Sequence, residues 1–288
     1  MSPTSQTPSK PETIQPTASN APNVQKPPDQ SESLENQSLA SESLESESLD
    51  GTPAGDTSNT AANQLKPIYF ISGLGADERI FRWLRCDGFQ PKHIHWLDPA
   101  RGESLESYAT RLAEQIEDEQ PIVVGLSFGG IIAVEIAKQI DTAKVILLSS
   151  TKTASEVPFY FKLFRALPIH RIFPFKSLLW GFLWLAYWLF APEGTDQRLL
   201  FKTILVETDA RFLKWALHKV VTWNNQHVPE TVVHIHGKRD RIFPYRFVTP
   251  DYAVERSGHL MVMNRAAEIS DLLDKVIVST ECSVKAKN

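Results

Sequence analysis

The sequence predicts an α/β protein built on a mostly parallel sheet of about six strands, with helices on both faces. Two observations predict this class. After residue 64, short apolar runs of strand length alternate with longer segments whose apolar residues recur at helical spacing. Every aromatic residue of the chain also lies in those 224 residues, which are enough to bury a substantial core.

The first strand is expected at 68–71, because this apolar run is closed by a Ser-Gly-Leu-Gly turn, and a helical stretch follows at 77–85. Strands are expected next at 93–97, 121–126 and 144–148, separated by helices at 104–117 and 130–140. Two further strands are expected at 231–236 and 252–255, before a terminal helix at 264–278. The expected helices at 104–117 and 264–278 show apolar residues three or four positions apart.

Residues 1–64 differ sharply from the rest of the chain. They contain 8 Pro, 12 Ser and 7 Thr, no aromatic residue, and 2 basic against 9 acidic side chains. Such a segment cannot bury enough apolar surface to offset its loss of conformational entropy, so we expect a disordered tail. The consecutive pentads SESLE, NQSLA, SESLE and SESLD at 31–50 are typical of an acidic low-complexity linker. A docking or phosphorylated segment is the alternative interpretation.

Charge and cysteine content exclude several classes of function. Residues 65–288 carry 28 basic and 25 acidic side chains, which is not the strong positive balance of a nucleic-acid-binding protein. The two cysteines, Cys86 and Cys282, form no disulfide framework, zinc spacing or redox motif. The N-terminus has no apolar core of a secretory signal, and we expect a cytoplasmic location.

The strongest motif is Gly-Leu-Ser-Phe-Gly-Gly at 125–130, where an apolar strand meets a helix. This G-x-S-x-G pattern forms a turn so tight that the flanking positions must lack side chains. The turn exposes the serine at the start of a helix, whose amides favour an anion. Ser127 is therefore the candidate nucleophile, and an idle serine in a glycine-rich turn is the alternative.

Acyl transfer also needs two backbone N–H groups directed at the developing oxyanion. In this type of turn one donor is the residue after the nucleophile, here Phe128. The second comes from the loop after an earlier strand, and Gly73-Leu74-Gly75 makes Leu74 the candidate.

A serine nucleophile requires a general base and a carboxylate that orients it. Asp240 follows the strand that ends in His236-Gly237, and His259 lies in a loop after the next strand. Along the chain the candidates follow in the order serine, aspartate, histidine, which is the order of triad residues in proteins that carry the G-x-S-x-G turn. Glu156, which follows the strand after the serine, is the alternative acid.

The remaining histidines do not indicate a metal centre. His93 and His95 alternate along one expected strand and His234 and His236 along another, so each pair could share a face. No carboxylate or cysteine at ligand spacing accompanies either pair. We therefore predict no metal site and no cofactor.

Four segments resemble compact bacterial-type α/β-hydrolase-fold proteins: YFISGLGADE at 69–78, GLSFGG at 125–130, HGKRDRIFP at 236–244 and GHLMVMN at 258–264. The resemblance covers about 65–278 except the middle section. It implies a serine hydrolase acting through Ser127, Asp240 and His259. It also implies a helical lid at 151–230, which divides the core into halves at 65–150 and 231–288. The family usually has two more strands before the oxyanion loop, so this sheet is expected to be trimmed.

The expected lid is rich in aromatic residues and holds five of the seven tryptophans. Residues 177–192 carry no charge, and Trp180, Trp184 and Trp188 recur every four positions on one helix face. A helix that is apolar on all sides is buried or lies in lipid. Our first interpretation is that the three tryptophans line an apolar substrate pocket. One alternative is peripheral membrane contact through 177–191. A membrane span is the last alternative, because the uncharged run is shorter than the length that a bilayer requires.

The sequence thus predicts an enzyme that cleaves a carboxylic ester or thioester of a small lipophilic substrate. Two other classes of function fit the same residues. A haloperoxidase-like or carbon–carbon bond hydrolase would use the same triad. A membrane-associated binding protein of the same fold would not need Ser127, Asp240 and His259 together.

Overall fold

The computed structural model describes residues 65–161 and 175–285, all of which belong to one unit of the chain, 60–288. For 175–182 and 280–285 only the backbone is described. The tail predicted to be disordered, 1–64, lies outside the described residues.

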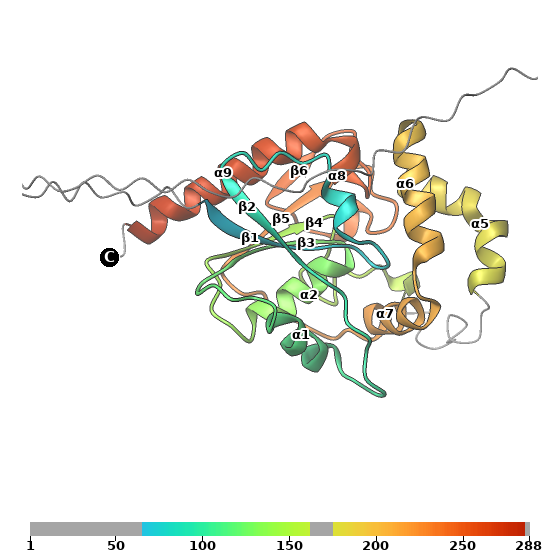
Figure 1. The fold of residues 1–288 in the computed structure, drawn as a ribbon, viewed down its shortest axis with the longest axis horizontal. Coiled ribbons are helices and arrows are strands. Elements are labelled where there is room, and N and C mark those ends of the chain that lie inside the picture. The colour runs from blue at the N-terminus through green and yellow to red at the C-terminus, as the bar shows by residue number, and fades with distance from the viewer. Residues whose placement is uncertain (1–64, 162–174, 286–288) are drawn as a thin grey trace, which may run out of the picture. The chain divides into compact units, whose positions relative to one another are not determined.

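A six-stranded sheet forms the centre of the protein (Figure 1). Its strands lie in the order β2-β1-β3-β4-β5-β6, and every neighbouring pair is parallel, as the sequence predicted. The strands are β1 (Lys66–Ile71), β2 (Phe89–Ile94), β3 (Ile122–Leu126), β4 (Lys144–Leu148), β5 (Val232–Gly237) and β6 (Tyr252–Val254).

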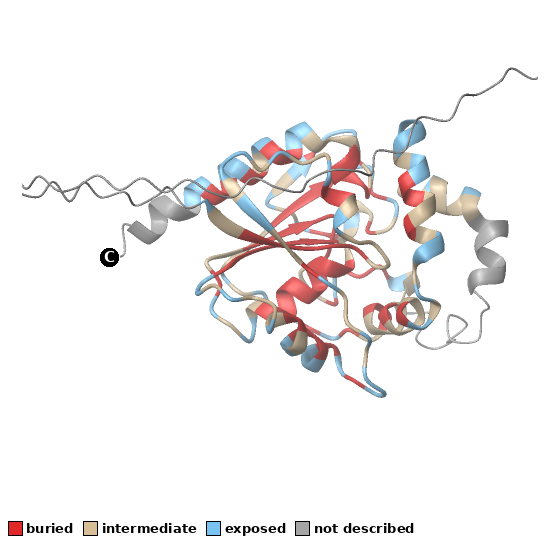
Figure 2. Cartoon of the chain, in the orientation of Figure 1, coloured by how far each residue is buried: buried red, intermediate tan, exposed pale blue. Residues whose placement is uncertain are grey.

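Alternation along the strands divides the interior into two apolar cores, one on each face of the sheet. In β4, Val145 and Leu147 belong to one core, whereas Ile146 and Leu148 belong to the other. Figure 2 shows β3 buried along its whole length, and β4 is buried except at Lys144, its first residue. Strands covered on both faces are almost entirely apolar, which explains the continuous apolar runs in the sequence.

Helices cover both faces of the sheet (Figure 1). One face carries α1 (Leu105–Ala113), whose first turn is capped by Ser104, and α2 (Phe128–Ala137). The other carries α8 (Met261–Asn264) and α9 (Ala266–Lys285). Short 3-10 turns η1 (Glu78–Phe81) and η2 (Tyr245–Phe247) lie in the connecting loops.

The expected strand at 93–97 is wrong in its bounds, because β2 begins at Phe89 and ends at Ile94. The segment Gln90-Pro91-Lys92 lies before the expected strand, yet it pairs in register with β1. β2 lies at an edge of the sheet, so it tolerates polar side chains and a proline, which has no backbone N–H to donate. The predicted helix at 77–85 is likewise only the short turn η1.

Between β4 and β5, the described residues form the helices α5 (Phe175–Phe190), α6 (Gly194–Glu207) and α7 (Ala210–Thr222). We call them the helical insert. Leu200, Phe201 and Ile204 of α6 belong to the core under α8 and α9, whereas Phe212 and Ala216 of α7 belong to the core under α1 and α2. The insert is therefore attached to both sides of the sheet. In the described residues, none of the helices has the length and apolarity needed to span a bilayer.

Candidate active site

Ser127 lies at the junction between β3 and α2 in a strained backbone conformation. Its φ of 54° and ψ of −117° are unusual for a residue with a side chain. The approach of helix to sheet is so close that a Cβ on Gly125 would lie 2.4 Å from the Gly129 oxygen, and one on Gly129 would lie 2.3 Å from the Ser72 oxygen. Only glycine fits at either position, which confirms the predicted tight turn.

The structure brings together the three residues that the sequence singled out. His259 Nε2 lies 2.8 Å from Ser127 Oγ, and His259 Nδ1 lies 2.8 Å from Asp240 Oδ2. Asp240 and His259 are both buried. The three side chains come from loops after β3, β5 and β6, which end at the same edge of a parallel sheet.

The loop that follows Asp240 holds its carboxylate in place. Asp240 Oδ1 accepts hydrogen bonds from the backbone N–H groups of Ile242 and Phe243, at 2.7 and 2.9 Å. This leaves Oδ2 directed at His259 Nδ1. An aspartate that accepts the Nδ1 proton selects the tautomer whose Nε2 lone pair faces the serine hydroxyl.

Two buried histidines lie behind the aspartate. His236 Nε2 is 2.7 Å from the Phe243 oxygen and 3.5 Å from Asp240 Oδ2, while its Nδ1 is 3.0 Å from His234 Nε2. Because a carbonyl only accepts, His236 Nε2 carries a proton, and its Nδ1 accepts from His234 in the neutral pair. Burial lowers the pKa of His236 and lowers that of His234 well below its ordinary value.

These depressed pKa values predict stability that is lost in acid. The unfolded chain takes up protons on these imidazoles near about pH 6.5, whereas the folded chain resists protonation, so the free energy of unfolding falls as the pH is lowered through that value. Replacing His234 with Gln is expected to make the melting temperature less sensitive to pH between about pH 7 and about pH 5. Thermal unfolding of both proteins across this range measures the effect, and equal slopes would contradict it.

The two candidate oxyanion donors lie beside the serine. Phe128 is the first residue of α2, so its backbone N–H has no carbonyl partner within the helix. Leu74 lies in the turn after β1, and its neighbour Gly73 is so close to Ser127 that a Cβ there would lie 3.5 Å from the serine Cβ. In the described part of the chain, the Leu74 N–H donates no backbone hydrogen bond.

Glu156, the alternative acid, is occupied elsewhere. Its carboxylate accepts from the backbone N–H of Lys152 at 2.6 Å, and from the N–H and hydroxyl of Thr249 at 3.1 and 2.8 Å. The geometry thus favours Asp240 as the partner of His259.

Aromatic rings flank His259. The ring of Phe190, from α5 of the insert, meets His259 edge-on at a centroid distance of 5.4 Å, and Phe243 lies at 5.9 Å. These rings give the surroundings of His259 an apolar character. Among the described residues, no group of three or more His, Cys, Asp or Glu side chains could hold a metal ion.

The tryptophan stripe lies differently from the first interpretation of a pocket lining. Trp184 and Trp188 are 66% and 53% exposed, whereas Ala186, Tyr187 and Phe190 pack against the core. The guanidinium of Arg241 lies over the Trp188 ring, 4.7 Å from its centroid. The side chain of Trp180 lies outside the described residues.

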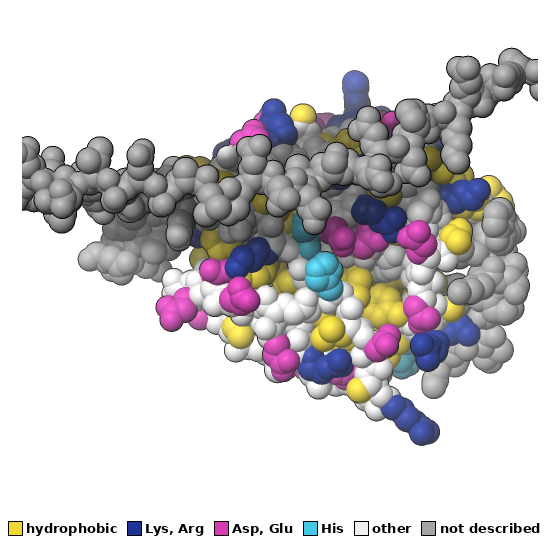
Figure 3. Space-filling view, viewed as in Figure 1, with side chains coloured by type: hydrophobic (Ala, Val, Ile, Leu, Met, Phe, Trp, Pro, Cys, Tyr) yellow, Lys and Arg dark blue, Asp and Glu magenta, His cyan; other side chains and the backbone are white. Residues whose placement is uncertain are grey.

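Sequence reasoning missed some groups that support the site. Ser150 Oγ donates to the Ser127 carbonyl oxygen at 2.7 Å, which no motif indicates. The alternation of His234 and His236 suggests only a metal-ligand role for His236, although its position four residues before Asp240 is a signal for a partner of that loop. Figure 3 shows basic and acidic side chains interspersed over the visible face, without a continuous basic surface there.

Comparison with known proteins agrees with this geometry. The model of the alpha/beta hydrolase family matches residues 67–272. Among curated protein sequences, none matches this chain.

Solved structures show the same fold at low sequence identity. A thermophilic esterase from Thermogutta terrifontis superposes with a TM-score of 0.56 at 16% identity, covering 75% of this chain and 91% of the esterase. A putative lipase from Acinetobacter baumannii AYE gives 0.59 at 13%, covering 77% and 86%. A bromoperoxidase from Bacillus anthracis gives 0.54 at 15%, covering 74% and 91%. Since the family model spans most of the chain, the protein belongs to the alpha/beta hydrolase family.

Proposed function

We propose that this protein is a serine hydrolase that cleaves a carboxylic ester or thioester carrying an apolar group. The observation that carries the proposal is the unbroken hydrogen-bond chain from Ser127 Oγ through His259 to Asp240. A serine followed by a buried imidazole and a buried carboxylate in this order forms an activated nucleophile.

In the first half of the reaction, Ser127 Oγ attacks the carbonyl carbon while its proton moves to His259 Nε2. The negative charge that develops on the carbonyl oxygen is held by the N–H groups of Leu74 and Phe128. The tetrahedral intermediate collapses, and His259 returns the proton to the departing alcohol or thiol. Asp240 stays ionised and stabilises the imidazolium.

In the second half, water takes the place of the leaving group. His259 accepts a proton from this water, whose oxygen attacks the acyl-serine carbonyl. Collapse of the second tetrahedral intermediate breaks the bond to Ser127 Oγ, which regains its proton from His259. A carboxylic acid is released and the enzyme is restored.

The apolar character of the substrate is inferred from the rings of Phe190 and Phe243 beside His259. A panel of esters from acetate to laurate, assayed with the full chain, tests this inference. We expect kcat/KM to rise with acyl length to an optimum beyond acetate. A maximum at acetate would contradict the apolar specificity, and failure to cleave any ester would contradict the esterase assignment.

The same triad serves haloperoxidase-like and carbon–carbon bond hydrolases, and a bromoperoxidase is among the proteins of similar fold. Assays of halide-dependent peroxide chemistry and of a β-diketone, run beside the ester panel, separate these activities. Ester cleavage that exceeds both supports the proposal.

The exposed tryptophans favour a second role for the insert, which is contact with a membrane surface by a protein of the cytoplasm. Trp184 and Trp188 are exposed to solvent on α5, and the Arg241 guanidinium lies over the Trp188 ring. Indole rings are favoured at the boundary between water and lipid, and a nearby cation favours an anionic surface.

Vesicle flotation tests this membrane contact. The wild type is expected to float with phosphatidylglycerol vesicles, and the Trp184→Ser, Trp188→Ser double variant is expected to remain at the bottom. Val278→Ser is a matched control, since Val278 is 55% exposed on α9, which is not part of the insert. Equal flotation of the double variant and the wild type would contradict the proposal.

A further inference from the structure

Helix α6 of the insert lies between two loops of the candidate site: the segment that follows His259 and the turn that contains Leu74. Near its N-terminal end, Gln197 Nε2 donates to the Met263 oxygen at 3.0 Å, and Asn264 Nδ2 donates to the Ala191 oxygen at 3.0 Å. These contacts tie the insert to the segment that follows His259. At its C-terminal end, α6 meets the turn that contains Leu74.

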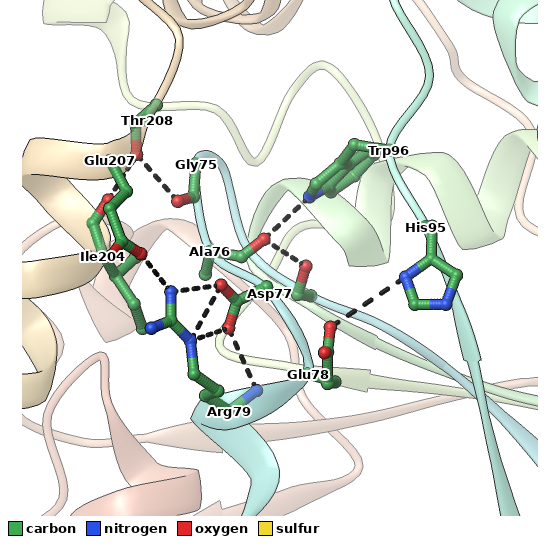
Figure 4. Close-up of polar contacts among 11 residues, drawn as sticks. Gly75, Ala76, Asp77, Glu78, Arg79, His95, Trp96, Ile204, Glu207 and Thr208 are labelled. Atoms are coloured by element: carbon green, nitrogen blue, oxygen red, sulfur yellow. Dashed lines mark hydrogen bonds and ion pairs between the residues drawn. The ribbon is translucent and has the colours of Figure 1, made fainter.

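Thr208, which caps the C-terminal end of α6, contacts this turn directly (Figure 4). Its Oγ1 lies 2.8 Å from the Gly75 oxygen and 2.8 Å from the Ile204 oxygen. Gly75 has a φ of +71°, and a Cβ there would lie 2.6 Å from Thr208 Oγ1. The insert and the turn therefore fit so closely that only glycine is accommodated opposite the threonine.

The turn relays this contact to the oxyanion donor. The Gly75 carbonyl and the Ala76 N–H belong to one peptide unit, and the Ala76 N–H donates to the Gly73 oxygen at 2.9 Å. The Gly73 carbonyl in turn shares a peptide unit with the Leu74 N–H. Because a trans peptide is planar, fixing its carbonyl also fixes the opposite direction of its N–H.

Other contacts hold the outer part of the turn. The Ala76 oxygen accepts from Trp96 Nε1 at 2.9 Å and from Ser72 Oγ at 2.6 Å. The Arg79 guanidinium bridges Asp77 and Glu207 of α6, as Figure 4 shows. This bridge is exposed to solvent, and such ion pairs contribute little. Of these two contacts with the insert, the hydrogen bond of the Thr208 hydroxyl is the one that is linked to the Leu74 N–H through the peptide units of the turn.

We propose that Thr208 is a positioning residue, whose hydroxyl sets the direction of the Leu74 N–H through two hydrogen-bonded peptide units. The inference rests on the proposed function, because it assigns the Leu74 N–H as an oxyanion donor. Gly73 and Gly75 leave this turn unusually free to rotate, so an external contact is needed to hold the donor ready. Hydrogen bonds in such a chain also polarise one another, which strengthens the final donor.

The test compares Thr208→Val, Thr208→Ser and Thr222→Val in the full chain, with a short ester as substrate. Thr222 also donates to the carbonyl four residues earlier, that of His218 at 2.6 Å, and therefore controls for loss of this helix contact. Complete loss of one oxyanion donor lowers kcat by about 10²–10³, so a donor that is only misdirected is expected to cost about tenfold. We expect this fall in kcat for Thr208→Val with KM nearly unchanged, rescue by Thr208→Ser, and wild-type kcat for Thr222→Val.

Hydrogen exchange of the Ala76 amide, which donates to the Gly73 oxygen on the path to Leu74, gives a second readout that does not depend on activity. Thr208→Val is expected to speed exchange at Ala76, and Thr222→Val is not. Wild-type kcat and exchange in Thr208→Val would overturn the proposal, as would an equal fall of kcat in both valine variants. If instead Ser127→Ala retained full hydrolysis, the proposed function would fail, whatever the Thr208 variants do.

Discussion

Ser127→Ala is expected to lower kcat for ester hydrolysis by on the order of 10⁵-fold or more, with the fold intact. The variant loses the hydroxyl oxygen that lies 2.8 Å from His259 Nε2 and would form the acyl-enzyme. The remaining oxyanion donors and substrate binding supply only residual catalysis. Initial rates on a short ester, together with labelling by a fluorophosphonate probe, measure the effect.

Ser155→Ala is a suitable control, because Ser155 is exposed and its hydroxyl contacts only Thr153 among the described residues. It is expected to keep the wild-type rate and to react with the probe. Labelling of Ser127→Ala at the wild-type rate would refute the nucleophile assignment. A melting temperature close to that of the wild type shows that the loss is not one of folding.

Asp240→Asn is expected to lower kcat by about 10⁴-fold. The amide can turn its NH₂ group toward His259 Nδ1, which then accepts, so that Nε2 carries the proton. A protonated Nε2 cannot take the proton of Ser127, although the residues remain in place. Steady-state kinetics on the same ester test this expectation.

The matched control for this experiment is Glu156→Gln, which alters the other candidate acid. Because the Glu156 carboxylate bonds to Lys152 and Thr249, the change is expected to affect stability more than kcat. A loss of activity in Glu156→Gln comparable with that expected for Asp240→Asn, with Asp240→Asn active, would reverse the assignment of the acid.

The fold class was predictable because its signals are local. Apolar runs that alternate with helical periodicity define strands and crossover helices, and these require a parallel sheet. The turn at Ser127 was equally predictable, since its glycines are required by a close approach that recurs wherever this turn is built. The bounds of β2 were not predictable, because an edge strand forms backbone hydrogen bonds with a neighbouring strand on one side only and so tolerates Pro91.

The part of the site that could be predicted is the part that the positions of its residues relative to the strands indicate. Ser127, Asp240 and His259 each follow a strand, and parallel strands bring their carboxyl ends to one edge, so their meeting could be inferred from topology. The choice between Asp240 and Glu156 could not, since both follow strands. It depends on the partners that the folded loops supply, here the N–H groups of Ile242 and Phe243 for Asp240.

By itself, then, the sequence determined the α/β class, the order of the strand segments along the chain and the candidate nucleophile and base, because these follow from local periodicity and from turns that only glycine permits. Tertiary structure alone decided which carboxylate faces His259, that Trp184 and Trp188 are exposed, and that Thr208 meets Gly75. The contacts of Asp240 with His259 and of Thr208 with Gly75 each join residues far apart in the chain. Their meeting depends on the packing of the helical insert and loops against the sheet, for which a single sequence carries no local signal.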